Sequence, residues 1–326
     1  MSALRAGVRG RRPPVAGRPS QGASSWSRTD RIGVAACWAA GILLCLICAA
    51  IVIYMLFRGL QYLTPKLLFS HPEPNLDQSK SGGFLDPLIG TFLLTTIGIV
   101  IALPIGVGIA VWIVEYGRPA WLARAVESGI EVVAGTPSIV LAIFGLLLFT
   151  QPVFGFLSFT AAGNAVFGRS FFTAGAMMSL IALPLVVGAT REALLSIPSH
   201  LREASYALGK TKAATIRRVL VPGARTGIAT GATLGMGRIA GDTAIVTILL
   251  GASLQLSPTG GVPILKTLRG TGSTLTSYVY NNSPAGEGQA PQKAYAAAFV
   301  LIVIVVILNF AVDLIGGRRQ KAGRAK

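Results

Sequence analysis

The chain has 326 residues, of which 52% are hydrophobic and only 13% are charged, and its mean hydropathy is +0.64. A soluble globule of this size needs more polar surface than this composition supplies, so the expected solvent is lipid. The net charge of +17 raises nucleic acid as a partner, but the distribution of the basic residues along the chain argues against that class.

Six stretches of the sequence are expected to cross a bilayer as helices, because each reaches the roughly 20 residues that a span requires. Five are free of charged residues, and the other contains two. In chain order they are 32–57, 87–114, a helix from 132 to about 150, 171–190, 226–250 and 294–312. The rest of the third run, to Gly168, contains Pro152, Gly155 and Gly163 and is expected to be a turn-rich external segment. The predicted fold class is therefore an all-α polytopic membrane protein with six transmembrane helices.

The Lys and Arg residues lie mostly on one side of this arrangement. On the side of both termini there are 21 of the 29, the opposite loops hold 7, and Arg238 lies within a span. Such an excess marks the cytoplasmic side, so both termini are expected in the cytoplasm, with the basic surplus near anionic lipid headgroups. The first apolar run is too long for a signal peptide and is expected to remain as a span. Its Cys37, Cys45 and Cys48 predict neither disulfides nor a metal site.

These features divide the chain into five parts. They are a basic cytoplasmic tail (1–31), the first span (32–57), an external loop (58–86), a five-span core (87–316) and a second basic cytoplasmic tail (317–326). Within the core, residues 115–127 are expected to form a short basic turn, and residues 252–292 a long external loop. The stretch from Ser257 to Pro263 in that loop is a candidate docking surface for an external partner.

The cytoplasmic loop from Arg191 to Pro222 predicts two short helices separated by a glycine. The first is expected to begin with Ser199 as its N-cap and to stop at Gly209, and the second to end before Pro222. The expected apolar positions are Ala204, Ala207, Leu208, Ile216, Val219 and Leu220, and the expected polar face of the second helix is Lys212, Arg217 and Arg218. Two such helices form a rigid knob that can transmit force to the spans on either side.

The spacing within this loop resembles the EAA loop of ABC importer permeases, which reads Glu-Ala-Ala, three residues, Gly, nine residues and Ile-x-Leu-Pro. Here Glu203-Ala-Ser, Gly209 and Val219-Leu-Val-Pro222 have the same spacing. The resemblance implies a type I importer permease fold, in which the first helix of the loop occupies a cleft of a separate ATPase. The residues that it assigns to ATPase coupling are Arg202, Glu203, Ala204, Ser205, Gly209 and Pro222. The alternative is an ordinary cytoplasmic hairpin with a C-cap glycine.

Arg238 and Asp242 lie four residues apart in the stretch 226–250 and are expected on one helical face. Each costs about 2.5 to 3.5 kcal/mol at the bilayer centre, so such residues usually face a pore or a partner. They suit a mutual ion pair. They suit equally an oxyanion site, in which the guanidinium donates to phosphate oxygens and the carboxylate accepts from a ligand hydroxyl.

The flanking residues favour the oxyanion site, because Arg238-Ile-Ala-Gly-Asp-Thr-Ala244 resembles the Arg-x-x-Gly-Glu-Thr-Ala segment of phosphate importer permeases of the PstA and PstC type. Gly135-Thr-Pro-Ser-Ile-Val140 resembles their Gly-x-Pro-Ser-Ile-Val stretch and favours the PstA type; the similarity covers roughly 82–317. The resemblance implies a substrate pathway that contains Arg238, Asp242, Thr243, Thr136 and Ser138. Asp242 stands where Glu is usual and reaches one methylene less far. For Thr136 and Ser138, hydrogen bonds back to their own helix are the favoured interpretation.

The sequence contains no Gly-x-x-x-x-Gly-Lys-Ser/Thr loop, so this chain is not expected to be an enzyme, and ATP and Mg²⁺ are expected on a partner subunit. His71 and His200 are assigned to opposite sides of the membrane, which disfavours a His-based metal site. The resemblance implies a bacterial inner-membrane assembly with a sister permease, two ATP-binding subunits and an external phosphate-binding protein. The alternatives are an importer permease for sulfate or molybdate, and a membrane enzyme, scaffold or sensor.

Overall fold

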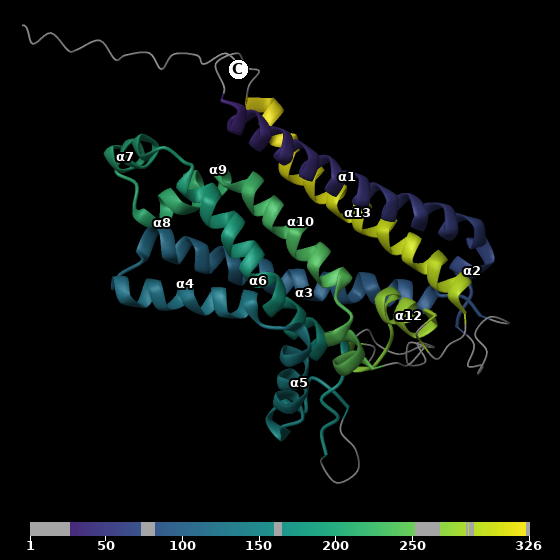
Figure 1. Cartoon of the computed structure of the whole chain (residues 1–326). Coiled ribbons are helices and arrows are strands. Elements are labelled where there is room, and N and C mark those ends of the chain that lie inside the picture. Colours follow the sequence, from purple (N-terminus) through teal and green to yellow (C-terminus); the bar gives the residue numbers. More distant parts are fainter. Residues whose placement is uncertain are drawn as a thin grey trace, which may run out of the picture. The chain divides into compact units, whose positions relative to one another are not determined.

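The computed structural model describes residues 27–72, 82–159, 165–251, 268–284, 286 and 290–323. The chain divides into two compact units, Met1–Tyr54 and Met55–Lys326. Its helices (Figure 1), with 3₁₀ and π segments marked η, are α1 (Arg28–Tyr62), α2 (Pro65–Phe69), α3 (Leu85–Val111), η2 (Trp112–Tyr116), α4 (Ala120–Gly135), α5 (Ser138–Phe149), η3 (Pro152–Phe154), α6 (Phe171–Leu195), α7 (Ser199–Ala207), α8 (Lys212–Thr215), η4 (Ile216–Leu220), α9 (Val221–Gly223), α10 (Arg225–Gly241), η5 (Val246–Leu250), α12 (Leu275–Asn282) and α13 (Pro291–Gly323). The expected all-α fold is confirmed for the described residues.

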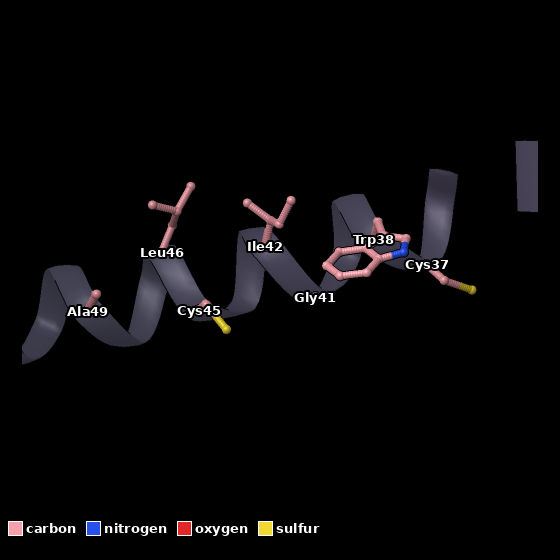
Figure 2. Close-up of a pocket in the computed structure, with 7 residues that line it drawn as sticks. All are labelled: Cys37, Trp38, Gly41, Ile42, Cys45, Leu46 and Ala49. Atoms are coloured by element: carbon pink, nitrogen blue, oxygen red, sulfur yellow. The ribbon is translucent and has the colours of Figure 1, made fainter. Parts of the chain in front are cut away.

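The first unit contains the N-terminal part of α1. Ser27 and Asp30 close the start of this helix reciprocally, because the Ser27 hydroxyl accepts from the Asp30 N–H and the Asp30 carboxylate accepts from the Ser27 N–H, each at 3.2 Å. The side chains from 28 to 54 are exposed, as suits a helix surrounded by lipid. One face of the helix, drawn in Figure 2, carries Cys37, Trp38, Gly41, Ile42, Cys45, Leu46 and Ala49. The three cysteines are free.

Helices α3, α6 and α10 form the centre of the second unit and lie side by side (Figure 1). Glycines permit their close approach: a Cβ at Gly98 of α3 would lie 2.8 Å from the Cδ1 of Ile239 in α10. Likewise, a Cβ at Gly227 of α10 would overlap the Cβ of Ala193 in α6. The three helices bury one apolar cluster, which α5 and η5 complete.

Two further apolar clusters lie at the two ends of α3. At its start, Phe84 packs against Tyr278 of α12 with ring centroids 5.9 Å apart, and α13 covers both. Tyr278 lies outside the candidate spans, and burial raises its pKa to about 12. At the other end, Ala110 packs with Leu194 and Leu220 beneath the loop that joins α6 to α10. That loop therefore rests on a buried apolar base.

The expected helix from 132 to about 150 is wrong, because the chain breaks between α4 and α5. The two helices are bent by 105° at Thr136 and Pro137. Pro137 has no N–H to donate and disfavours a helical residue before it, and the backbone of Thr136 is accordingly extended. The expected basic turn at 115–127 is also wrong in its second half, since α4 already begins at Ala120.

The expected continuous helix at 226–250 is likewise interrupted. Helix α10 ends at Gly241, Asp242 has extended backbone angles, and helical structure resumes two residues later and continues through η5. Among the described residues, four helices are long and apolar enough to cross a membrane, and the bent pair α4–α5 would make a fifth. The expected count of six is therefore not confirmed, because the expected span at 226–250 is interrupted at Asp242 and is not among these candidates.

The predicted boundaries of the connecting segments also shift. Helix α1 continues to Tyr62, so the loop expected at 58–86 begins later and contains α2. Helix α13 continues to Gly323, into the tail expected from 317. The stretch from Ser257 to Pro263 and the tail before Ser27 lie outside the described residues.

Candidate functional site

The loop between α6 and α10 forms the expected pair of short helices, and Gly209 separates them with a φ of +72°. A left-handed backbone of this kind favours glycine. The expected cap is wrong: Ser199 is the first helical residue of α7, and Pro198 precedes it without a side-chain cap. The hydroxyls of Ser205 and Thr215 are 2.8 Å apart and buried, so they join α7 to α8. Ser205, the departure from the Glu-Ala-Ala pattern, thus has a structural role.

The second helix of the loop was expected to end before Pro222, and this expectation is wrong because the helical path leads on towards α10. Segments η4 and α9 continue the helical path through Pro222 to Gly223, and α10 begins at Arg225. Proline is tolerated here because it occupies the first turn of α9. Leu220 is fully buried, whereas Arg217 and Arg218 are exposed as predicted. The loop is therefore mechanically continuous with α10.

The outer face of α7 carries two of the six residues that the resemblance assigns to ATPase coupling. Glu203 and Ala204 are exposed, and Leu208 just beyond the helix is 78% exposed. The predicted apolar face of this helix thus points away from the rest of the chain. An exposed apolar face on a rigid hairpin is a typical protein-binding surface.

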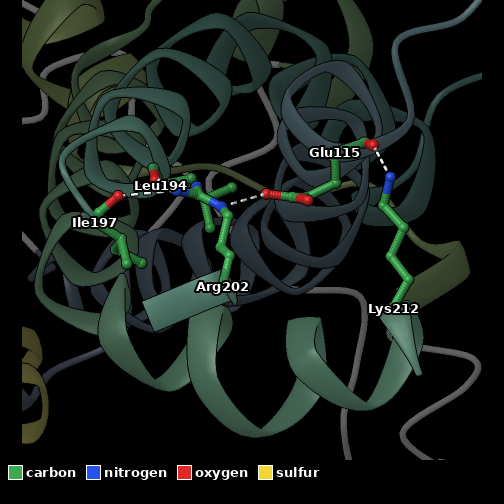
Figure 3. Close-up of polar contacts among 5 residues, drawn as sticks. All are labelled: Glu115, Leu194, Ile197, Arg202 and Lys212. Carbon is green, nitrogen blue, oxygen red and sulfur yellow. Dashed lines mark hydrogen bonds and ion pairs between the residues drawn. The ribbon is translucent and has the colours of Figure 1, made fainter. Parts of the chain in front are cut away.

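Arg202, which the resemblance assigns to ATPase coupling, binds within this chain (Figure 3). Its Nε donates to the Glu115 carboxylate at 3.0 Å, and its Nη1 and Nη2 donate to the carbonyls of Ile197 and Leu194 at 2.8 and 2.9 Å. Lys212 approaches the same place from α8: its Nζ donates to the Glu115 carbonyl and lies 4.6 Å from the centroid of the Tyr116 ring.

The sequence prediction did not single out Glu115 for any role. One signal was present, because Glu115 is the first charged residue after the charge-free run 87–114. A second ion pair at the same end joins Glu127 of α4 to Arg191 of α6 at 3.0 Å and is more exposed. This contact joins the last turns of α6 to α4.

Arg238 and Asp242 do not share a helical face. Arg238 is exposed on α10, whereas Asp242 lies beyond the end of that helix, is 5% exposed and accepts the Ile245 N–H at 3.0 Å. In the part of the chain that the structure describes, no ion pair or hydrogen bond joins the two side chains. Asp242 acts as the N-cap of the helical segment that follows.

Thr136 confirms the favoured interpretation, since its hydroxyl donates to the Val132 carbonyl of its own helix at 2.7 Å. Ser138 is the first residue of α5 and is half-buried. Thr243 is half-buried beside Asp242, and its carbonyl accepts from Thr247. Both helix interruptions therefore fall within the two segments that resemble phosphate permeases.

The helical segments that follow the two interruptions pack against each other. Leu141 and Ala142 of α5 belong to the same buried cluster as Val246 and Leu249 of η5. The structure thus links the two interruptions through apolar packing. Among the described residues, no group of three or more His, Cys, Asp and Glu side chains is placed to hold a metal ion.

Residues 102–321 match the family described as "Binding-protein-dependent transport system inner membrane component". Phosphate transport system permease protein PstA 1 of Mycobacterium tuberculosis H37Rv is 34% identical over 240 residues, which cover 74% of this chain and 71% of the relative. PstC of Xylella fastidiosa strain 9a5c is 31% identical over 289 residues, which cover 84% of each chain. The PstA and PstC relatives match at similar identity, so the preference for the PstA type stays a prediction.

Two solved transporters are similar in structure. A chain of the inward-facing MetNI methionine ABC transporter is 25% identical with a TM-score of 0.50, over 72% of this chain and 93% of that chain. A chain of a bacterial alginate ABC transporter is 15% identical with a TM-score of 0.59, over 90% and 96% respectively, which shows the fold alone. The chain therefore belongs to the binding-protein-dependent transport system inner membrane components and has the fold of a type I ABC importer permease.

Proposed function

We propose that this chain is the permease subunit of an ATP-driven importer of inorganic phosphate in a bacterial inner membrane. The observation that supports phosphate as the substrate is the segment around Arg238, which resembles that of phosphate permeases. Two relatives of this chain, at 31% and 34% identity, are phosphate transport system permeases. Arg238 is exposed, and within the described residues its guanidinium has no hydrogen-bond or ion-pair partner. A planar fork of N–H donors suits phosphate oxygens.

Asp242 supplies the second part of the proposed substrate pathway. It lies four residues beyond Arg238, directly after α10, and its Oδ1 accepts the Ile245 N–H of the helical segment that follows. We expect the carboxylate to favour HPO₄²⁻, which keeps a proton to donate, over sulfate, which has none. Thr243, Thr136 and Ser138 complete the proposed pathway at the two interruptions.

Coupling to ATP hydrolysis is assigned to the loop from Arg191 to Pro222. Its outward face holds Glu203, Ala204 and Leu208, and Ser205 and Gly209 fix the shape of the hairpin. The continuity of this loop with α10 supports the assignment, since displacement of the hairpin displaces the helix that carries Arg238. Arg202 contributes from inside the loop through its contact with Glu115, whereas Pro222 is exposed and lies where the loop leads into α10.

The proposed assembly comprises this chain, a sister permease, two ATP-binding subunits and an external phosphate-binding protein. ATP and Mg²⁺ belong to the ATP-binding subunits, and both termini of this chain lie in the cytoplasm. Closure of the ATP-binding subunits moves the hairpins, and the pathway near Arg238 then opens to the other side of the membrane.

Uptake of labelled phosphate by the reconstituted complex tests the substrate. We expect Arg238→Gln to abolish uptake and Arg238→Lys, which keeps the charge without the planar fork, to reduce it. Arg124→Gln is the matched control, because it removes an exposed arginine of α4 whose one hydrogen bond within the described residues goes to the carbonyl of Ala120 in its own helix. Normal uptake by Arg238→Gln would contradict the proposal. If the reconstituted complex takes up sulfate or molybdate in preference to phosphate, its substrate is that oxyanion instead.

A further inference from the structure

Glu115 is a buried acid that directly follows the charge-free run 87–114. It lies in the π-helical turn η2, which follows α3 directly, and its side chain is 8% exposed. A buried carboxylate needs both a counter-charge and hydrogen bonds. Arg202, 87 residues later in the chain, supplies both through its Nε at 3.0 Å. The contact therefore ties the end of α3 to α7, although the two are far apart in sequence.

The same guanidinium also binds the end of α6. Helix α6 ends at Leu195, so the carbonyls of its last turn have no partner within the helix. Nη2 of Arg202 donates to the Leu194 carbonyl at 2.9 Å, and Nη1 donates to the Ile197 carbonyl at 2.8 Å. A positive charge at this end also suits the helix dipole. One planar side chain thus joins three elements, which a lysine ammonium does not reproduce.

Lys212 makes a second connection to the same turn from α8, as Figure 3 shows. Its ammonium donates to the backbone carbonyl of Glu115 and lies over the ring of Tyr116. Helices α7 and α8 therefore both hold the end of α3. The buried hydroxyl pair of Ser205 and Thr215 keeps α7 and α8 together.

We propose that Glu115, Tyr116, Arg202 and Lys212 form a clamp that transmits movement of the coupling loop to α3. The inference rests on the proposed function and deepens it. The loop is joined covalently only to α6 and α10, so α3 can follow it only through contacts, and the clamp adds directional polar contacts to the apolar packing of Ala110 against Leu220. Glu115 is a positioning residue: it acts through Arg202 and touches neither substrate nor ATP.

The pair Glu127–Arg191 offers a matched control. It lies at the same end of the molecule with the same 3.0 Å separation, but it joins α4 to α6 and its side chains are 34% and 44% exposed. An exposed pair of this kind contributes little, because solvent screens it. Glu127→Gln therefore makes the same chemical change as Glu115→Gln outside the clamp.

The experiment uses the complete transporter in proteoliposomes, with phosphate uptake, ATP hydrolysis and the amount of assembled complex measured together. In Glu115→Gln, the amide still accepts from Arg202 but leaves the guanidinium without a counter-charge. We expect normal assembly, ATP hydrolysis near wild type, and phosphate uptake per ATP that falls about tenfold. Glu127→Gln keeps wild-type values. The double variant Glu115→Gln, Arg202→Gln is no worse than the more impaired single variant, because both changes remove the same Glu115–Arg202 ion pair.

Lys212→Met is the second variant, and it tests the other connection at an exposed position that does not threaten folding. We expect a smaller loss of uptake per ATP in the same direction. Unchanged coupling in Glu115→Gln and Lys212→Met overturns the clamp, and so does a parallel loss of hydrolysis, uptake and assembly. Failure of the proposed function looks different, because the wild-type complex then takes up no phosphate. The same ratios are then measured for the oxyanion that it does carry.

Discussion

At the scale of single residues, Asp242 is the residue whose interpretation differs most between the sequence and the structure. In the sequence it reads as half of an i, i+4 pair with Arg238. In the structure it ends one helix and caps the next, through its Oδ1 and the N–H of Ile245. The shorter side chain suits this role, because aspartate is among the best N-cap residues and glutamate is not. The departure from the usual Glu thus has a local physical reason.

Two substitutions separate the cap from the charge at this position. Asp242→Asn keeps the cap, since asparagine caps about as well as aspartate, and removes only the charge. We expect it to retain its melting temperature and lose its preference for phosphate over sulfate in competition uptake. Asp242→Ala removes the cap as well and should cost about 1 kcal/mol of stability. An Asn variant that discriminates between the two anions as wild type does would contradict a selective role for the carboxylate.

At the scale of elements, Gly209 is the position on which the hairpin depends. Its φ is +72°, and a Cβ built there meets nothing within 4 Å, so a substitution is penalised by backbone strain and not by crowding. Gly209→Val should therefore cost about 1 to 2 kcal/mol locally and change the angle between α7 and α8. We expect ATP hydrolysis to persist in the complex while phosphate uptake is lost.

Gly209→Asn is the control for that experiment, because asparagine tolerates the left-handed region better than other residues. It should retain most of the uptake. Equal loss in both variants would mean that the absence of any side chain, rather than the backbone conformation, matters at this position.

The interrupted helices mark the limit of what the sequence predicts at this scale. Apolar composition predicted where the chain is membrane-like, and the EAA spacing predicted the hairpin with its glycine. Hydropathy does not register a break inside an apolar run, although Pro137 is a local signal for the one between α4 and α5. The break at Asp242 depends on whether its side chain caps the next turn, which tertiary packing decides. The contact of Glu115 with Arg202 spans 87 residues, so no local pattern reveals it.

At the scale of the whole molecule, the orientation in the membrane is the prediction that charge alone supports. Basic residues gather in the loop that contains Leu208, whereas the segment that contains Phe156 has none nearby except Arg169. Helix α6 lies between these segments, and its 25 residues span about 37 Å, enough to cross the hydrocarbon core. Leu208 and Phe156 are 78% and 67% exposed, so each tolerates a labelled cysteine.

In a background with Cys37, Cys45 and Cys48 replaced by alanine, a membrane-impermeant maleimide reads the orientation directly. We expect Leu208→Cys to react only in inverted vesicles and Phe156→Cys only in right-side-out vesicles. The opposite pattern would place the coupling loop outside the cell, where no ATPase can reach it, and would contradict both the positive-inside argument and the proposed coupling. Reaction of both cysteines from the same side would mean that α6 does not cross the membrane. One of the four continuous candidate spans would then be wrong.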